Sequence, residues 1–340
     1  MELFVDAATQ YRDFAFHTRG ESPCFEAWAL GVAADDEVLA MIGELPPIKQ
    51  QPNLVLAAAR WHGVTTPAPY AVFRRELMSG WTAIRNTVLT RSTQTNEVGR
   101  LATLVPAFAA IQSSGRRPLA LLEVGASAGL CLFPDRYRYA WSTSSGQRTT
   151  AAPPDGPVLS CTVTGPAPLP SAPPEIGWRA GVDLNPLAVE DEDAMAWLEN
   201  LVWPEQDGRR ARLRTAVGVA RQDPPRLWRG DLLHALPDLI GQVPAGSAVV
   251  VFHTAVIAYL EPAQRGQFHD LMMSLVADRR CHWVSNEGER VLPQVTATEP
   301  AGVSSELPFV LGVDGQAVGR THGHGQALSW WPESMLRPPA

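Results

Sequence analysis

The chain has 340 residues and a formal net charge of −7, and 45% of its residues are hydrophobic whereas 19% are charged. This composition supports a sizeable core and excludes wholesale disorder. The excess of acidic residues argues against a nucleic-acid partner held by phosphate contacts, so we expect a small-molecule substrate.

The single lysine and the spacing of the four cysteines exclude further classes of binding site. Lys49 is the only lysine, which excludes a phosphate loop ending in Gly-Lys-Ser or Gly-Lys-Thr. The four cysteines have no zinc-ligand spacing and are typical of a reducing compartment, so no structural metal is expected. The first residues do not resemble a signal peptide, and no apolar stretch is long enough to span a bilayer. We therefore expect a cytoplasmic protein without a membrane partner.

Helical patterns fill the first third of the chain. Apolar residues recur at the three-and-four spacing of one helix face from Val98 to Ile111, and earlier segments have a similar spacing. No strand is expected before residue 118, and we predict a helical N-terminal cap over residues 1–115. The earlier helical segments are 3–16, 23–32, 53–61 and 70–89.

Short apolar runs separated by helical patterns follow. Strands that alternate with helices predict a parallel sheet with right-handed crossovers. Near the end, Asp314-Gly315 favours a hairpin between 307–313 and 316–320, because this pair suits a turn with positive φ. We predict a Rossmann-like α/β domain over 116–340, with a parallel sheet and antiparallel C-terminal strands. The expected parallel strands are 119–124, 178–184, 226–228, 248–252 and 281–285, the helices are 189–202, 209–221 and 262–277, and a last possible strand is 326–331.

An insertion, residues 134–177, interrupts this plan. Residues 136–141 alternate like a strand, and 147–150 could pair with them. The segment from Pro153 to Pro174 contains eight prolines, these two included. Because proline lacks the amide N–H that a helix or an interior strand needs, we predict an extended loop there.

The most informative segment is LLEVGASAGL, residues 121–130. A hydrophobic strand carries Glu123 near its end, and Gly125, Ser127 and Gly129 follow at alternate positions. Ligands of parallel sheets bind at the carboxyl ends of the strands. Glycines there let the backbone approach a ligand, and the start of a following helix offers free N–H groups. The segment therefore predicts a ligand-binding loop.

This segment resembles the glycine-rich loop of class I S-adenosylmethionine-dependent methyltransferases. The resemblance implies that Asp183 takes the ribose hydroxyls, that Asp231 lies near the adenine, and that His253 and Thr254 face the methyl-transfer site. It also implies a sheet that ends in an antiparallel pair. The implied cofactor is S-adenosylmethionine, and the residues implied to bind it are Arg100, Glu123, Gly125, Ala126, Ser127, Gly129, Asp183, Leu184, Asp231, Leu232 and His253.

Three residues have a functional and a structural interpretation. His253 could be a general base, since an ordinary histidine pKa of about 6.5 suits neutral pH, or a hydrogen-bonded residue at a strand end. Glu287, which follows Asn286, could act as the base, hold a cationic substrate or cap a turn. Arg100 could bind the carboxylate of the cofactor's methionine part, or form a surface pair with Glu97.

The same loop also contains the G-x-S-x-G pattern of α/β-hydrolases. The chain order of such an enzyme would be met by Ser127, by Asp231 or Asp314, and by His322 or His324. The helical start of the chain and the carboxylate of Glu123 disfavour this alternative. A cofactor-binding protein that has lost transfer activity is a further alternative. The glycines around His322 and His324 favour a loop over a metal site.

The chain resembles, over most of its length, a bacterial family known only as domain of unknown function 2332. That family looks like a methyltransferase-fold family with an added helical N-terminal region. The combined expectation is a methyltransferase that acts on an unknown small-molecule acceptor. The motifs that carry the resemblance are 95–100 (TNEVGR), 121–130 with 135–139 (DRYRY), 202–205 (VWPE) and His324-Gly325.

Overall fold

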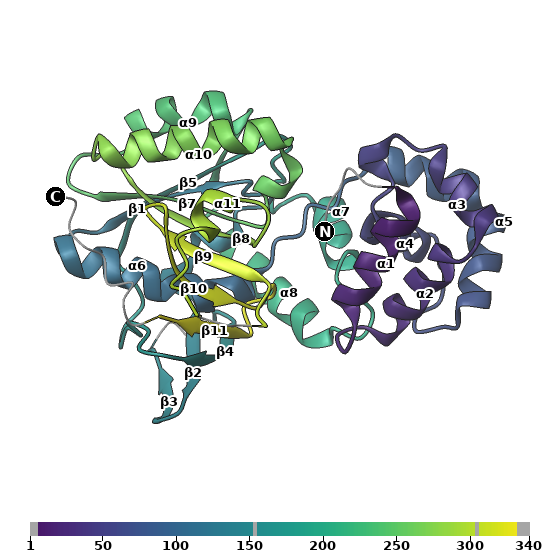
Figure 1. The fold of residues 1–340 in the computed structure, drawn as a ribbon, viewed down its shortest axis with the longest axis horizontal. Coiled ribbons are helices and arrows are strands. Elements are labelled where there is room, and N and C mark those ends of the chain that lie inside the picture. The colour runs from purple at the N-terminus through teal and green to yellow at the C-terminus, as the bar shows by residue number, and fades with distance from the viewer. Residues whose placement is uncertain (1–5, 152–154, 303–305, 332–340) are drawn as a thin grey trace. The chain divides into compact units, whose positions relative to one another are not determined.

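Figure 1 shows a computed structural model of the chain, which describes residues 6–151, 155–302 and 306–331. The expectations for the first five residues and for Pro153 and Pro154 lie outside this range. The chain divides into two compact units, one of residues 1–95 with 191–211 and one of residues 96–190 with 212–340. The helix at Leu101–Gly115, which the sequence prediction assigned to the N-terminal cap, belongs to the second unit.

The first unit is helical. The side chains of Asp6, Ser22 and Asp35 each accept a hydrogen bond from the backbone N–H three residues later, which explains where its first three α-helices begin. Its core is aromatic, and the rings of Trp28 and Phe73 are stacked 4.4 Å apart. The elements of this unit are α1 (Ala7–Thr18), α2 (Pro23–Ala33), α3 (Asp36–Gly43), η1 (Pro47–Lys49), α4 (Pro52–Trp61), α5 (Tyr70–Thr90), α7 (Glu192–Asn200) and the start of α8 (Asp207–Gln222).

The second unit is built on one mixed sheet of 11 strands, and six of its ten strand pairs are parallel. The strands are β1 (Leu119–Val124), β2 (Arg138–Thr143), β3 (Gly146–Thr149), β4 (Val158–Thr164), β5 (Ile176–Asp183), β6 (Arg226–Arg229), β7 (Ala248–Thr254), β8 (His282–Gly288), β9 (Phe309–Val313), β10 (Gln316–Thr321) and β11 (Ala327–Trp330). Their order is β3-β2-β4-β11-β10-β9-β8-β7-β1-β5-β6. The fold is therefore a mixed α/β fold with a large, mostly parallel sheet.

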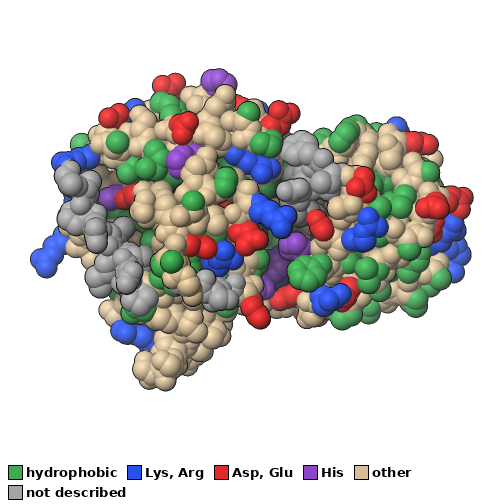
Figure 2. Space-filling model, in the orientation of Figure 1, with side chains coloured by type: hydrophobic (Ala, Val, Ile, Leu, Met, Phe, Trp, Pro, Cys, Tyr) green, Lys and Arg blue, Asp and Glu red, His purple; other side chains and the backbone are tan. Residues whose placement is uncertain are grey.

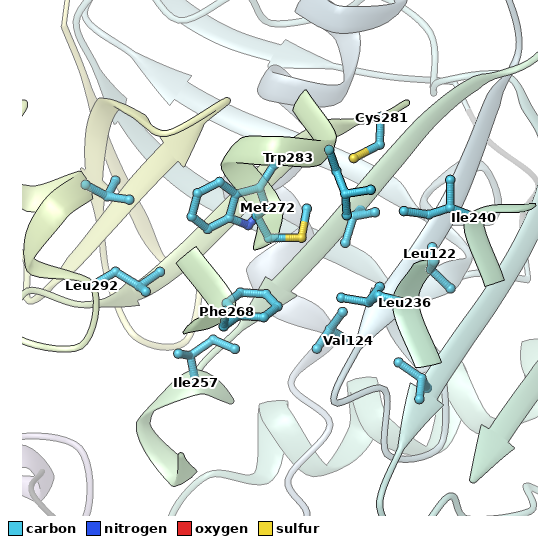
Figure 3. Packing of buried hydrophobic residues seen from close by; sticks show 14 of the residues in the cluster. Leu122, Val124, Leu236, Ile240, Ile257, Phe268, Met272, Cys281, Trp283 and Leu292 are labelled. Atoms are coloured by element: carbon cyan, nitrogen blue, oxygen red, sulfur yellow. The ribbon is translucent and has the colours of Figure 1, made fainter. Parts of the chain in front are cut away.

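Helices cover both faces of this sheet (Figure 1). Helix α6 (Leu101–Gly115) packs on one face, where the ring of Phe108 meets that of Phe252 edge to face at 5.3 Å. On the other face α9 (Leu232–Gly241) and α10 (Pro262–Ala277) cover a cluster of buried apolar residues, which includes Leu122, Leu236 and Phe268 (Figure 3). The remaining elements are η2 (Val98–Arg100), η3 (Leu130–Leu132), η4 (Pro134–Arg136), η5 (Ile257–Tyr259) and α11 (Pro293–Thr296).

Most of the predicted elements are confirmed. No strand precedes β1 in the part of the chain that the structure describes. All six residues of β1 are buried, as its continuous apolar run predicts for a central parallel strand. The hairpin of β9 and β10 is also confirmed, and Asp314 and Gly315 have φ of 50° and 80°.

The prediction of an extended loop for the proline-rich stretch is confirmed for residues 165–175, which contain no helix or strand, and is wrong for residues 158–164. Strand β4 lies inside it and pairs in parallel with both β2 and β11, so it is an interior strand of the sheet. The prolines flank this strand without interrupting it, since Pro157 precedes it and Pro166 follows it. Within the strand, buried and exposed residues alternate strictly.

Charge is dispersed on the face of the molecule that Figure 2 shows. On the face shown in Figure 2, basic and acidic side chains are interspersed, with no extended basic stretch among the residues drawn in colour. None of the helices in the described ranges has the length and apolar character needed to cross a membrane.

Candidate functional site

The carboxyl ends of five parallel strands form one edge of the sheet. Strands β1, β5, β6, β7 and β8 run in the same direction, so residues at their ends lie along that edge. All the site residues predicted from the sequence lie on or shortly after one of these strands, except Arg100, which precedes α6.

The glycine-rich loop follows β1 and bends toward β5. Gly125, Ser127 and Gly129 have φ of 69°, 53° and 69°, a left-handed conformation that is uncommon for serine. The amide N–H groups of Gly125 and Ala126 both donate to the carbonyl of Val182, at 2.8 and 3.2 Å. These bonds hold the predicted loop against the end of β5.

Asp183 at the end of β5 holds the loop from the side. Its Oδ2 accepts the N–H of Ser127 at 2.9 Å, and its Oδ1 accepts the N–H of Asn185 at 2.7 Å. The side chain is half-buried, and a carboxylate oxygen can accept more than one hydrogen bond. Asp183 can therefore stabilise the loop and still accept hydrogen bonds from a ligand.

The glycines of this region make room for protein side chains. A methyl group on Gly125 would lie 2.1 Å from Cγ2 of Val256, and one on Gly181 would lie 2.5 Å from Cβ of Ala126. From the sequence, these glycines were expected to let a ligand approach the backbone. In this structure the side chain of Val256 lies against Gly125 instead.

Glu123 is a buried carboxyl group beneath the loop. It is 2% exposed, and its Oε2 has no hydrogen-bond partner among the described residues. Burial raises the pKa of Glu123 well above its usual value, the charge of Asp183 raises it further, and Arg100 opposes both effects. Burial and the charge of Asp183 therefore favour the protonated form of Glu123.

The segment before α6 packs under the same edge. Arg100 is 9% exposed and donates from Nε to the carbonyl of Gly323 at 2.7 Å and from Nη1 to the carbonyl of Thr254 at 3.2 Å. Oδ1 of Asn96 accepts the N–H of Leu130 at 2.9 Å. Arg100 is thus largely buried, which disagrees with the surface pair considered from the sequence and brings its positive charge near Glu123.

Two of the family motifs meet here. A methyl group on Gly99 would lie 2.6 Å from the carbonyl oxygen of His324, and one on Gly325 would lie 2.1 Å from the carbonyl oxygen of Gly99. Only glycine allows this contact between the two backbones. Asn96 and Gly99 therefore link the segment before α6 to the glycine-rich loop and to the turn that follows β10.

His253 on β7 is fully buried and both of its ring nitrogens are engaged. Its Nδ1 lies 2.8 Å from Oε1 of Glu287, and its Nε2 accepts the indole N–H of Trp283 at 3.0 Å. The same Oε1 accepts the N–H groups of Val256 and Ile257 at 3.0 and 3.2 Å. This geometry favours the structural interpretation of His253 over a general base, because a base needs a free nitrogen.

Further polar atoms without partners lie at the ends of β7 and β8. Glu123 is opposite Phe252, and Thr254 is opposite Asn286 in register, so these residues share the face covered by α6. The hydroxyl of Thr321 donates to Oδ1 of Asn286 at 2.7 Å. Among the described residues, Oγ1 of Thr254, Nδ2 of Asn286 and Oε2 of Glu287 are buried without partners.

Asp231 and Leu232 begin α9. Oδ1 of Asp231 accepts the N–H of Leu233 at 2.8 Å, which makes this acid the N-cap of the helix. Leu232 is partly buried against the apolar cluster. Leu184 is 69% exposed just beyond Asp183, so it offers an apolar contact at the edge of the sheet.

The contacts at Asp314 and His253 bear on the hydrolase alternative. The carboxylate of Asp314 accepts from Trp283 N–H at 2.7 Å and lies 2.8 Å from Nδ1 of His282. Asp314 is thus paired with a histidine other than the two considered for a triad. Both nitrogens of His253, the histidine on the strand beside β1, are also engaged. These bonds disfavour a triad that uses Asp314 or a base at His253.

Three residues that shape the site were not identified from the sequence. Trp283 orients His253, and Val256 lies against Gly125. Arg179 forms a two-bond ion pair with Asp135, at 3.0 and 2.9 Å, and donates to the carbonyl of Leu132 just after the loop. An arginine on a predicted buried strand is the one signal that could have drawn attention to Arg179.

The chain belongs to the family described as "Uncharacterized protein conserved in bacteria (DUF2332)", whose family model matches residues 8–330. This match confirms the family suggested by the sequence motifs. The chain matches none of the curated proteins with which it was compared.

Proposed function

We propose that this protein binds S-adenosylmethionine at the carboxyl edge of the sheet and transfers its methyl group to a small-molecule acceptor. The observation that carries the proposal is the placement of Glu123 and Asp183 at the ends of neighbouring strands, next to the glycine-rich loop. Class I methyltransferases, which the loop resembles, use acids at the corresponding strand ends.

The strand order supports a Rossmann-like interpretation of the sheet. Without the insertion, the parallel strands in chain order are β1, β5, β6, β7 and β8. They lie side by side in the sheet in the order β6-β5-β1-β7-β8, which is 3-2-1-4-5 when they are numbered along the chain. This is the order of doubly wound nucleotide-binding folds. The order reverses between β1 and β7, and such a reversal is where ligands bind in open parallel sheets.

The residues at this edge fit a nucleoside cofactor, although the side chain of Val256 occupies the space next to Gly125. Asp183 would accept the ribose hydroxyls, Asp231 and Leu184 would lie on the adenine side, and the unpaired Oε2 of Glu123 would accept a donor from the methionine part. Val256 would have to leave its position against Gly125. When bound, the cofactor supplies an electrophilic methyl carbon on a sulfonium centre.

Glu287 is the better candidate for proton removal. Its Oε1 is held by His253 and by two backbone N–H groups, so the carboxylate has a defined orientation. Its Oε2 is buried and has no partner in the described part of the chain. In this scheme His253 is a positioning residue, and positioning supplies most of the rate.

Calorimetric titration with S-adenosylmethionine and with S-adenosylhomocysteine tests the proposal. We expect both to bind the wild type and to bind Asp183→Asn at least about tenfold more weakly, because the amide lacks the charge and one of the acceptors. The control is Asp270→Asn, which removes the same charge from a side chain that is 84% exposed. Absence of binding to the wild type would refute the proposal.

Two outcomes would support the alternatives. Binding of both compounds without any methyl transfer would indicate a protein that keeps the site but not the reaction. Val256 against Gly125 is the observation that favours this alternative. Labelling of Ser127 by a fluorophosphonate would support a hydrolase instead.

A further inference from the structure

We propose that the methyl acceptor is an amine, which arrives as an ammonium cation and binds Oε2 of Glu287. The inference deepens the proposed function and rests on it. Its basis is a buried carboxylate with one oxygen saturated by donors and the other without any.

The hydrogen bonds of Glu287 are distributed unequally. Oε1 lies within 2.8 to 3.2 Å of three nitrogens, on His253, Val256 and Ile257. Oε2 has no partner among the described residues, although the side chain is only 3% exposed. A buried acceptor without a donor is costly, so its retention points to a ligand that supplies the donor.

The protonation of His253 leaves the charge of Glu287 uncompensated. The indole N–H of Trp283 can only donate, so Nε2 of His253 accepts and the single ring proton lies on Nδ1. This histidine is neutral and donates to Glu287. Three donors on Oε1 suit an ionised carboxylate, and a buried negative charge is normally paired with a cation. An ammonium ligand supplies both a cation and N–H donors.

The position of Glu287 connects it to the glycine-rich loop through one residue. The N–H of Val256 donates to Oε1 of Glu287, and the side chain of the same valine lies against Gly125. Asp183 lies at the same edge of the sheet, at the end of β5. A carboxylate or phosphate acceptor would be repelled by the carboxylates of Asp183 and Glu287, whereas a cation is attracted to them.

The proton transfer balances without a further reactant. One N–H bond of the ammonium breaks, its proton forms an O–H bond with Oε2, and the electron pair remains on nitrogen. The ammonium becomes a neutral amine with a lone pair, and the carboxylate becomes a neutral acid. The nitrogen is then a nucleophile, which an ammonium ion is not.

Calorimetry with three probes of equal chain length tests the inference. Hexylamine, hexanol and hexanoate are titrated into the wild type, with and without saturating S-adenosylhomocysteine. We expect hexylamine to bind at least about tenfold more tightly than either of the others. In Glu287→Gln the amide oxygen can still accept the three N–H donors, while an NH₂ group replaces Oε2. We expect this variant to lose the preference for hexylamine and to keep its affinity for S-adenosylhomocysteine. Asp270→Asn, the control for charge, should retain both.

Each outcome decides the question. Equal binding of hexanol or hexanoate to the wild type would overturn the inference, and that comparison needs no variant to fold. Binding of hexylamine to Glu287→Gln as tightly as to the wild type would also overturn it. If S-adenosylhomocysteine does not bind, the proposed function fails. The titrations without it still show whether Glu287 forms a cation site.

Discussion

The acidic side chains in the two halves of the carboxyl edge differ in their hydrogen-bond partners. At β5 and β6, Asp183 and Asp231 accept backbone N–H groups of the turns and helices that follow them. At β1 and β8, Glu123 and Glu287 each have a buried oxygen without a partner in the described structure. Local structure accounts for the first pair. The second pair is costly to the fold, which is expected of groups reserved for a ligand.

The largest expected effect concerns the partner of His253. Trp283 is fully buried, so Trp283→Ala should lower the free energy of unfolding by about 3–5 kcal/mol. Trp283→Phe keeps most of the apolar volume and removes the N–H that His253 accepts, which should cost about 1–3 kcal/mol. Urea denaturation measures both. If the phenylalanine variant is as stable as the wild type, His253 does not depend on this bond.

The burial of Glu123 can be tested through the dependence of the free energy of unfolding on pH. Its pKa is raised in the folded state, so the folded protein keeps a proton that the unfolded chain loses above the ordinary value of 4.5. Wild-type stability should therefore fall as pH rises from there, by up to about 1.4 kcal/mol per pH unit until the folded pKa is reached. Glu123→Gln has no such titration, so the stability of the variant relative to that of the wild type should increase as pH rises.

Chemical denaturation at a series of pH values between 5 and 8 measures this difference. Glu175→Gln is the matched control, because Glu175 is exposed in the same unit. A stability difference between Glu123→Gln and the wild type that stays constant with pH would show that the carboxyl group is not perturbed by burial.

A smaller effect is expected at β5 and β6, where the acids form local hydrogen bonds with the backbone. Asp231→Ala removes the N-cap of α9 and should cost about 1 kcal/mol, whereas Asp231→Asn should recover most of this loss, since asparagine caps equally well. Thermal denaturation of the two variants provides the comparison. Equal loss in both would mean that the charge of Asp231, and not its hydrogen bond, stabilises the structure.

The smallest expected effect tests the space against Gly125. Val256→Ala removes the methyl groups that a ligand must displace. The affinity for S-adenosylhomocysteine should rise by about fivefold, equivalent to the roughly 1 kcal/mol of a small apolar contact. Calorimetry compares the variant with the wild type. Weaker binding to Val256→Ala would indicate that this side chain contacts the ligand.

Sequence patterns anticipated the parts of the fold that local chemistry specifies. The buried run of β1 and the Asp314-Gly315 turn each follow from a few neighbouring residues. Strand β4, in contrast, was not predicted from local sequence. Proline counts over a whole stretch obscured a seven-residue strand between Pro157 and Pro166 that contains no proline.

The candidate site was foreseen in its residues more than in their bonds. Asp183 and the loop were named from motif spacing, and the structure joins them by a hydrogen bond. The roles considered for His253 and Glu287 could not be separated from sequence. Which of the two keeps a free polar atom depends on Trp283 and on the N–H groups of Val256 and Ile257.

The sequence by itself determined the alternation of strands and helices, the loop after the first strand and the acids at the strand ends, because these depend on periodicity and turn chemistry within short segments. Only the tertiary structure decided which of those acids keep a buried oxygen without a hydrogen-bond partner among the described residues. Hydrogen-bond partners and burial arise where segments distant in the chain come together, as when Gly99 meets Gly325 or Val256 meets Gly125. No local pattern encodes such contacts.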